Sequence, residues 1–152
     1  MSQSIKEIVL EETKAAMKAH NKERLMVLRL ISSEIKRIEV DERIVLDTTR
    51  ELAVLDKMQK QRRDSIEQFR AANRNELADK EQFEIDVIQS FMPEALSDQE
   101  VHNLVADAIK ETGAASIQDM GKVMAILKPK LQGRADMGQV SVKIKALLAG
   151  QA

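Results

Sequence analysis

The chain of 152 residues is 43% hydrophobic and 32% charged, has a formal net charge of -1 and contains no cysteine. Disulfides, thiolate metal sites and thiol catalysis are therefore excluded, and no apolar run reaches the roughly 18 residues that a membrane span needs. The only aromatic residues are three phenylalanines, whereas strands are rich in aromatic side chains. We therefore expect an all-α protein, and a cytoplasmic one, because the first residues lack the apolar core of a signal peptide.

Apolar residues at helical spacing predict four helices in the first part of the chain. Their approximate ranges are 4–19, 22–40, 49–72 and 76–91. Short polar breaks separate them, and such breaks favour antiparallel neighbours, hence a helical hairpin or bundle. At the start of the third helix, Thr48-x-x-Glu51 matches a capping box, in which two side chains bond free backbone N–H groups at the helix end.

Pro93 separates this region from the rest of the chain, because the residue before a proline is disfavoured in the helical conformation. A second capping box, Ser97-x-x-Glu100, starts a helix over residues 98–112. Gly113 suits the left-handed backbone position that commonly follows the last turn of a helix.

Two further helices are predicted over about 117–127 and 137–149. The first of them either ends at residue 127 or continues, kinked, through Pro129. We therefore expect an N-terminal helical domain of residues 1–93 and a three-helix domain of residues 94–152.

Gly121 lies inside the helix predicted over 117–127. A glycine in a helix interior costs about 1 kcal/mol relative to alanine. Close packing of another helix against Gly121 would explain it, and we prefer this interpretation to a hinge.

The sequence lacks the common motifs of active sites. There is no phosphate-binding loop and no dinucleotide fingerprint. The two histidines, His20 and His102, fall in different predicted domains and outside any metal-ligand spacing. The many carboxylates alternate with cations along the helices, which is typical of solvated faces. We predict no catalytic residue, no metal and no cofactor.

Every charged residue between Asp119 and Asp136 is a cation, whereas acids and bases alternate in the rest of the chain. These cations are Lys122, Lys128, Lys130 and Arg134. They either solvate a loop and favour the C-terminal end of a helix, or contact the phosphates of a nucleic acid. Because so few aromatic rings are available for base stacking, a folded RNA recognised by shape and backbone fits better than a single strand.

The pattern Asp-Met-Gly-x-Val occurs twice, beginning at Asp119 and at Asp136. Two helix N-termini could offer their backbone N–H groups to phosphates. Alternatively, each aspartate is the N-cap of its helix and accepts those N–H groups itself, and its charge would repel a phosphate. We favour the second interpretation, because aspartate caps are common.

Three stretches carry a resemblance to a known family. They are Asp119-Met-Gly-Lys-Val-Met with Gly133-Arg-Ala-Asp136, Arg62-Arg63-Asp64-Ser65-Ile66, and Phe91-Met-Pro-Glu-Ala-Leu-Ser97. Over nearly its whole length the chain resembles the GatB/YqeY family, which covers stand-alone YqeY-like proteins, the C-terminal tail of the glutamyl-tRNA amidotransferase B subunit, and a tail of some glutaminyl-tRNA synthetases.

The resemblance implies tRNA as a partner, with an aminoacyl-tRNA synthetase or an amidotransferase as further candidates. The positions that it carries over for RNA binding are Lys122, Lys128, Lys130, Gly133 and Arg134. The catalytic core of the amidotransferase is not in this chain.

Three functions are open at this point. The favoured one is a non-catalytic protein that binds tRNA or a tRNA-handling enzyme. The second is an auxiliary factor in carbon–nitrogen ligase chemistry of the amidotransferase type, with glutamine as amido donor, acting only with a catalytic partner. The third is a protein–protein adaptor that uses the long helix predicted over 49–72 and has no RNA role.

Overall fold

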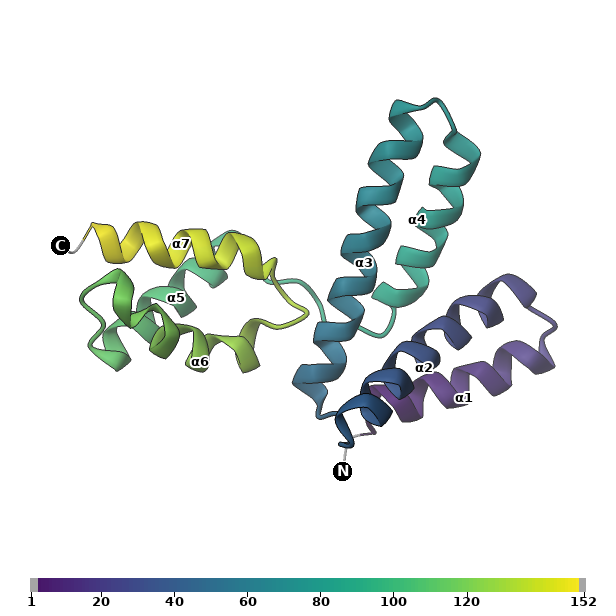
Figure 1. Cartoon of the computed structure of the whole chain (residues 1–152), viewed down its shortest axis with the longest axis horizontal. Helices are drawn as coiled ribbons and strands as arrows, with labels where there is room; N and C mark the ends of the chain where they lie inside the picture. The colour runs from purple at the N-terminus through teal and green to yellow at the C-terminus, as the bar shows by residue number, and fades with distance from the viewer. Residues whose placement is uncertain (1–2, 151–152) are drawn as a thin grey trace. The chain divides into compact units, whose positions relative to one another are not determined.

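The computed structural model describes residues 3–150. Over these residues the chain has seven α-helices, one short 3-10 helix and no β-strand, which confirms the all-α prediction. The helices form two compact units that divide between Met92 and Pro93, and each is described by itself (Figure 1). That each unit is an independently folding domain stays a prediction.

Unit 1 consists of two helical hairpins (Figure 1). Their helices are α1 (Ile5–Lys18), α2 (Lys22–Glu42), α3 (Thr48–Ala71) and α4 (Asn75–Gln89). All four predicted helices are therefore present, with ends that differ by at most two residues, as is usual where helices fray.

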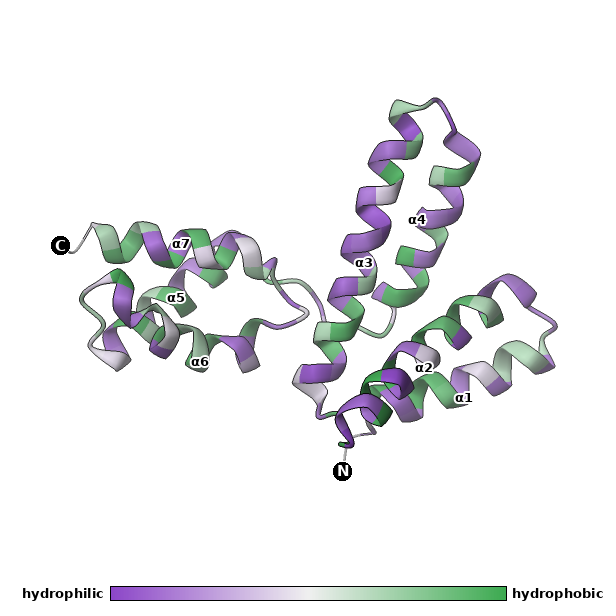
Figure 2. Ribbon diagram, viewed as in Figure 1, coloured by the Kyte–Doolittle hydropathy of each residue, from purple (hydrophilic) through white to green (hydrophobic). Residues whose placement is uncertain are grey.

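The apolar stripes of the four amphipathic helices pack together to form the core of unit 1. Figure 2 shows hydrophobic residues interleaved with hydrophilic ones along these helices. The fully buried side chains include Val9, Leu28, Ile31, Ile35, Leu55 and Ile88. Removal of this apolar surface from water stabilises the unit at roughly 25 cal/mol per Å².

The capping box predicted at Thr48 and Glu51 is wrong. Asp47 is the N-cap of α3, and its Oδ1 accepts the Arg50 N–H at 2.8 Å. Glu51 therefore lies one position beyond the place that a capping box requires, and its side chain points inward. Its carboxylate accepts the backbone N–H groups of Ile5 at 3.3 Å and Lys6 at 2.8 Å, so it caps α1 instead.

Unit 2 contains α5 (Asp98–Thr112), the 3-10 helix η1 (Ile117–Asp119), α6 (Met120–Leu131) and α7 (Met137–Ala149). The Ser97–Glu100 capping box is confirmed: Ser97 Oγ accepts the Glu100 N–H at 3.1 Å, and Glu100 Oε1 accepts the Ser97 N–H at 3.4 Å. Gly113 has a φ of 67°, as the predicted left-handed stop requires.

The three helices of unit 2 enclose a second core. Its fully buried members are Val105, Val123, Leu127, Leu131, Ile144 and Leu148. The members on α6 and α7 recur at helical spacing and form one buried stripe on each helix. The burial of this stripe sets how each helix is rotated about its axis.

Helix α6 differs from its prediction at its start, whereas its end matches the second of the two alternatives given for it. Residues 117–119 are 3-10 rather than α-helical, and α6 runs through Pro129 to Leu131. Pro129 lies in the last turn and cannot donate the N–H that the Ala125 carbonyl would otherwise receive. Because Ala125 is exposed, water can solvate that carbonyl.

The close packing predicted at Gly121 is also wrong. A Cβ atom built on Gly121 would meet no heavy atom within 4 Å. Its φ is not positive, so the backbone does not require glycine either. Nothing within unit 2 explains this residue.

Candidate nucleic-acid interface

Charge is strongly separated along unit 2. Residues 93–119, which include α5, carry six carboxylates and one lysine, whereas residues 120–150 carry six cations and one carboxylate. The cations are Lys122, Lys128, Lys130, Arg134, Lys143 and Lys145. A chain that is nearly neutral overall thus has a basic half-domain, formed by α6 and α7, which we call the basic half.

The three lysines of α6 do not form a single cluster. With 3.6 residues per turn, Lys122 and Lys128 lie about 120° apart around the helix axis. Lys130 lies about 160° from Lys128 but only about 80° from Lys122. All three are exposed. The predicted lysines are therefore spread around α6: Lys122 and Lys128 lie on the two sides of one exposed face, and Lys130 lies farther round the helix beyond Lys122.

The middle of that exposed face carries only small side chains. Gly121, Ala125 and Pro129 follow one another at four-residue spacing, so they form one stripe, and all three are exposed. Lys122 and Lys128 flank the stripe. We call these five residues the α6 outer face. The four-residue spacing can be read from the sequence. The prediction that another helix packs against Gly121 implied, however, that this stripe is buried.

Most lysines of the basic half lack a carboxylate partner. Within residues 3–150, no ion pair involves Lys128, Lys130 or Lys145. Lys122 Nζ lies 3.9 Å from Asp119 Oδ1, but its side chain is 72% exposed, and such surface pairs contribute little. These ammonium groups are thus free to meet an external anion.

Gly133 and Arg134 have structural roles in the loop between α6 and α7. Gly133 is buried and has a φ of 80°, a conformation that favours glycine. Arg134 Nε donates to the Glu94 carbonyl at 3.1 Å, and the Arg134 carbonyl accepts the Leu96 N–H at 2.9 Å. Arg134 thereby ties the loop to the segment that precedes α5.

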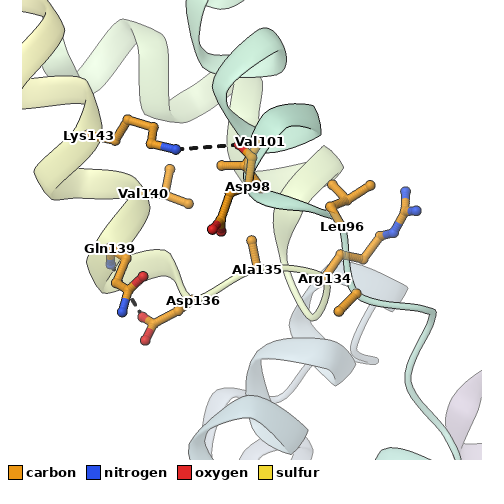
Figure 3. A pocket seen from close by; sticks show the side chains of 10 residues that line it. Leu96, Asp98, Val101, Arg134, Ala135, Asp136, Gln139, Val140 and Lys143 are labelled. Carbon is orange, nitrogen blue, oxygen red and sulfur yellow. Dashed lines mark hydrogen bonds between the residues drawn. The ribbon is translucent and has the colours of Figure 1, made fainter.

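A hollow of about 260 Å³ lies beside this loop (Figure 3). In Figure 3, the Asp98 carboxylate reaches into the hollow, whereas the Arg134 guanidinium extends away from it. Lys143 Nζ is 3.5 Å from the Asp98 carbonyl oxygen. The carboxylates of Asp98 and Asp136 would repel a phosphate here, so the hollow is unsuited to binding one.

The N-cap prediction for the repeated Asp-Met-Gly pattern is confirmed at one of its two positions. Asp136 Oδ1 accepts the N–H groups of Gly138 at 2.9 Å and Gln139 at 3.4 Å and so caps α7. Asp119 instead accepts the N–H groups of Ala115 and Ser116, which precede it. These hydrogen bonds, the one from Ala115 foremost, lower the pKa of Asp119.

The described residues hold neither a metal-type cluster nor a membrane-type helix. Over residues 3–150, no group of three or more His, Asp or Glu side chains is arranged to hold a metal ion. His20 and His102 are both exposed, in different units. Within the same range, no helix is both long and apolar enough to cross a bilayer.

The fold and this surface define a small, all-α protein in which the residues of α6 and α7 are markedly basic. The chain belongs to the YqeY-like protein family, whose match covers residues 6–148. It is similar to "Altered inheritance of mitochondria protein 41, mitochondrial" of Pyrenophora tritici-repentis, with 31% identity over 92% of this chain and 78% of the relative. An uncharacterised protein of Schizosaccharomyces pombe is 32% identical over 62% of this chain and 76% of its own length.

Proposed function

We propose that the protein binds tRNA, or another folded RNA, through the basic half of unit 2 and catalyses no reaction on it. The charge separation in unit 2 carries this proposal: residues 120–150 hold six cations and a single carboxylate. That carboxylate, Asp136, is engaged at the start of α7. A polyanion gains free energy on such a surface through release of its counterions.

The α6 outer face supports close contact with an RNA backbone. Gly121 and Ala125 carry no side chain beyond Cβ, so a phosphodiester can approach the helix itself. Lys122 and Lys128 lie on the two sides of this approach and can each neutralise a phosphate. Such contacts position a nucleic acid without reading its bases, so several tRNA species should bind similarly.

A folded RNA fits better than a single strand. Residues 93–152 contain no aromatic residue, and binders of single strands stack bases on aromatic rings. Duplex RNA is recognised mainly by shape and backbone contacts. The resemblance to the tail of the amidotransferase B subunit selects tRNA as the first RNA to test. The location of the protein is a separate question. A cytoplasmic location stays a prediction, whereas the name of one relative describes that relative as mitochondrial.

The salt dependence of tRNA binding tests the proposal. We expect the logarithm of affinity to fall linearly with the logarithm of salt concentration, by about 0.7 to 0.9 per phosphate neutralised. Replacing Lys122, Lys128 and Lys130 with Gln should reduce the slope by about 1.4 to 2.7, for two to three lost contacts. Fluorescence anisotropy with labelled tRNA measures the slope.

A second triple variant controls for net charge. Lys14→Gln, Lys18→Gln and Lys36→Gln remove the same charge from exposed positions of unit 1. This control should leave the slope nearly unchanged. Equal effects of the two triple variants, or no tRNA binding by the parent protein at low salt, would overturn the proposal and favour an adaptor role.

A further inference from the structure

Unit 1 has an open groove between the start of α2 and the middle of α4. Its volume is about 510 Å³. The apolar side chains of Met26, Val27 and Phe83 line it, and Met26 is 58% exposed while Phe83 is 37% exposed. Phe83 is thus the most exposed of the chain's three phenylalanines and does not belong to the core cluster.

The groove continues along the outer surface of α2. A second hollow of about 540 Å³ shares Lys22 and Met26 with the first and extends to Leu30. Leu30 is 39% exposed and lies one helical turn beyond Met26. Phe83, Met26 and Leu30 therefore form one apolar track across two helices. Single exposed apolar residues are normal on a protein surface, but a track set in a groove is characteristic of a binding site.

The charges around the track differ between its two ends. At the α4 end, Glu23, Glu76, Asp79 and Glu84 outnumber Lys22 and Lys80. At the other end, beside Leu30, the charged lining residue is Arg29, whereas Lys22 lies where the two hollows meet. The groove is therefore acidic at one end and basic at the other. The excess of carboxylates at the α4 end opposes the binding of RNA or of an anionic membrane there.

Ion pairs within unit 1 leave part of this acidic charge available. Glu84 pairs with Arg62 at 2.9 Å, and both side chains are largely buried. Asp79 pairs with Arg70 at 3.2 Å, but its side chain stays 71% exposed. Glu23 takes part in no ion pair among the described residues. Glu23 and Asp79 are thus placed to meet cations of a bound segment.

We propose that this groove binds an amphipathic α-helix of another protein. Apolar side chains of that helix, spaced at i and i+4, pack on Phe83, Met26 and Leu30. Its N-terminal turn and basic side chains lie at the acidic α4 end, and its C-terminal end lies near Arg29, because this orientation matches the helix dipole. The flexible Met26 side chain adapts to the exact shape of the apolar residues.

Selection from a phage-displayed library of helical peptides, each about four turns long, tests the proposal with the full chain as bait. We expect enrichment of peptides that combine an apolar i, i+4 stripe with basic residues toward the N-terminus. Met26→Ser with Leu30→Ser should weaken the binding of synthetic versions at least about tenfold. Both residues are exposed, so circular dichroism should show unchanged helix content.

A matched control replaces Ile117 and Val142, two apolar residues of unit 2 that are at least half exposed, with Ser. This control should retain the parent affinity. Absence of enrichment, or selected peptides that bind the Met26→Ser, Leu30→Ser variant as well as the parent, would overturn the proposal. So would sedimentation evidence of a dimer that the same substitutions dissociate, since a second copy would then occupy the groove. None of these outcomes depends on RNA binding.

Discussion

Glu51 is the most deeply buried ionisable residue among those described, with 1% of its surface exposed. Its carboxylate caps the first turn of α1 from α3, across the core of unit 1. Next to it, Lys6 Nζ pairs with Glu39 Oε1 at 2.7 Å, and Glu39 Oε2 accepts the Leu46 N–H at 3.0 Å. One polar network thus joins the starts of α1 and α3 to the end of α2.

Burial raises the pKa of Glu51, while the N–H groups of Lys6 and Ile5 act in the opposite direction. A carboxyl whose pKa is raised in the folded state contributes stability below its unfolded pKa of about 4.3 and loses that contribution as the pH rises through the folded value. The free energy of unfolding of the parent, minus that of Glu51→Gln, should therefore fall as the pH rises above about 4.3. Urea denaturation at several pH values measures this difference. An increase with pH would mean that the helix N-terminus outweighs burial.

Arg134, which is predicted to contact RNA, also makes a structural contact within unit 2. Its Nε holds the Glu94 carbonyl at 3.1 Å. Arg134→Ala should lower the free energy of unfolding of unit 2 by about 1 kcal/mol, the net contribution of a typical hydrogen bond. Thermal denaturation followed by circular dichroism checks this. An unchanged melting temperature together with a reduced salt slope for tRNA would assign Arg134 to RNA binding alone.

At the scale of elements, helix α6 contains a glycine, Gly121, that neither packing nor backbone conformation within unit 2 requires. Gly121 costs helix stability, yet alanine would fit without contact. Gly121→Ala should therefore raise the free energy of unfolding by up to about 1 kcal/mol. Thermal or urea denaturation measures the gain. A loss of stability would show that the first turn of α6 needs glycine for its backbone.

A longer side chain at position 121 distinguishes an effect on stability from an effect on tRNA binding. Gly121→Gln should keep the helix stable, because glutamine is a good helix former, but should weaken tRNA binding several-fold by blocking the α6 outer face. Ala106→Gln adds the same side chain to an exposed position of α5 and should leave tRNA binding unchanged.

Local signals predicted the helices well. The Ser97–Glu100 box and Gly113 bound α5 at the predicted residues, because those signals depend only on neighbouring residues. Glu51 was misassigned, because a motif cannot show that a carboxylate will cap a helix 45 residues away in the chain. Similarly, the cations between Asp119 and Asp136 were found as a run, but their distribution around α6 depends on which stripe is buried, and the role of Arg134 depends on a long-range contact.

At the scale of the whole molecule, the two units have separate cores and separate surfaces. Unit 2 has its own caps, a continuous apolar core and no cysteine or metal requirement in its sequence. We expect residues 93–152 to fold alone, although domains of about 60 residues are marginally stable. Circular dichroism of this fragment should show a helical spectrum with a cooperative thermal transition. A coil-like spectrum at low temperature would show that unit 2 depends on unit 1.

The central claim is that the basic half of unit 2 meets RNA through α6. Amide chemical-shift mapping of the full 17.1 kDa chain during titration with tRNA tests it most directly. The proposal predicts that Gly121, Lys122, Ala125 and Lys128 change most, while the amides of α1 and of the acidic helix α5 change little. Changes confined to unit 1 or to α5, or none at low salt, would contradict it.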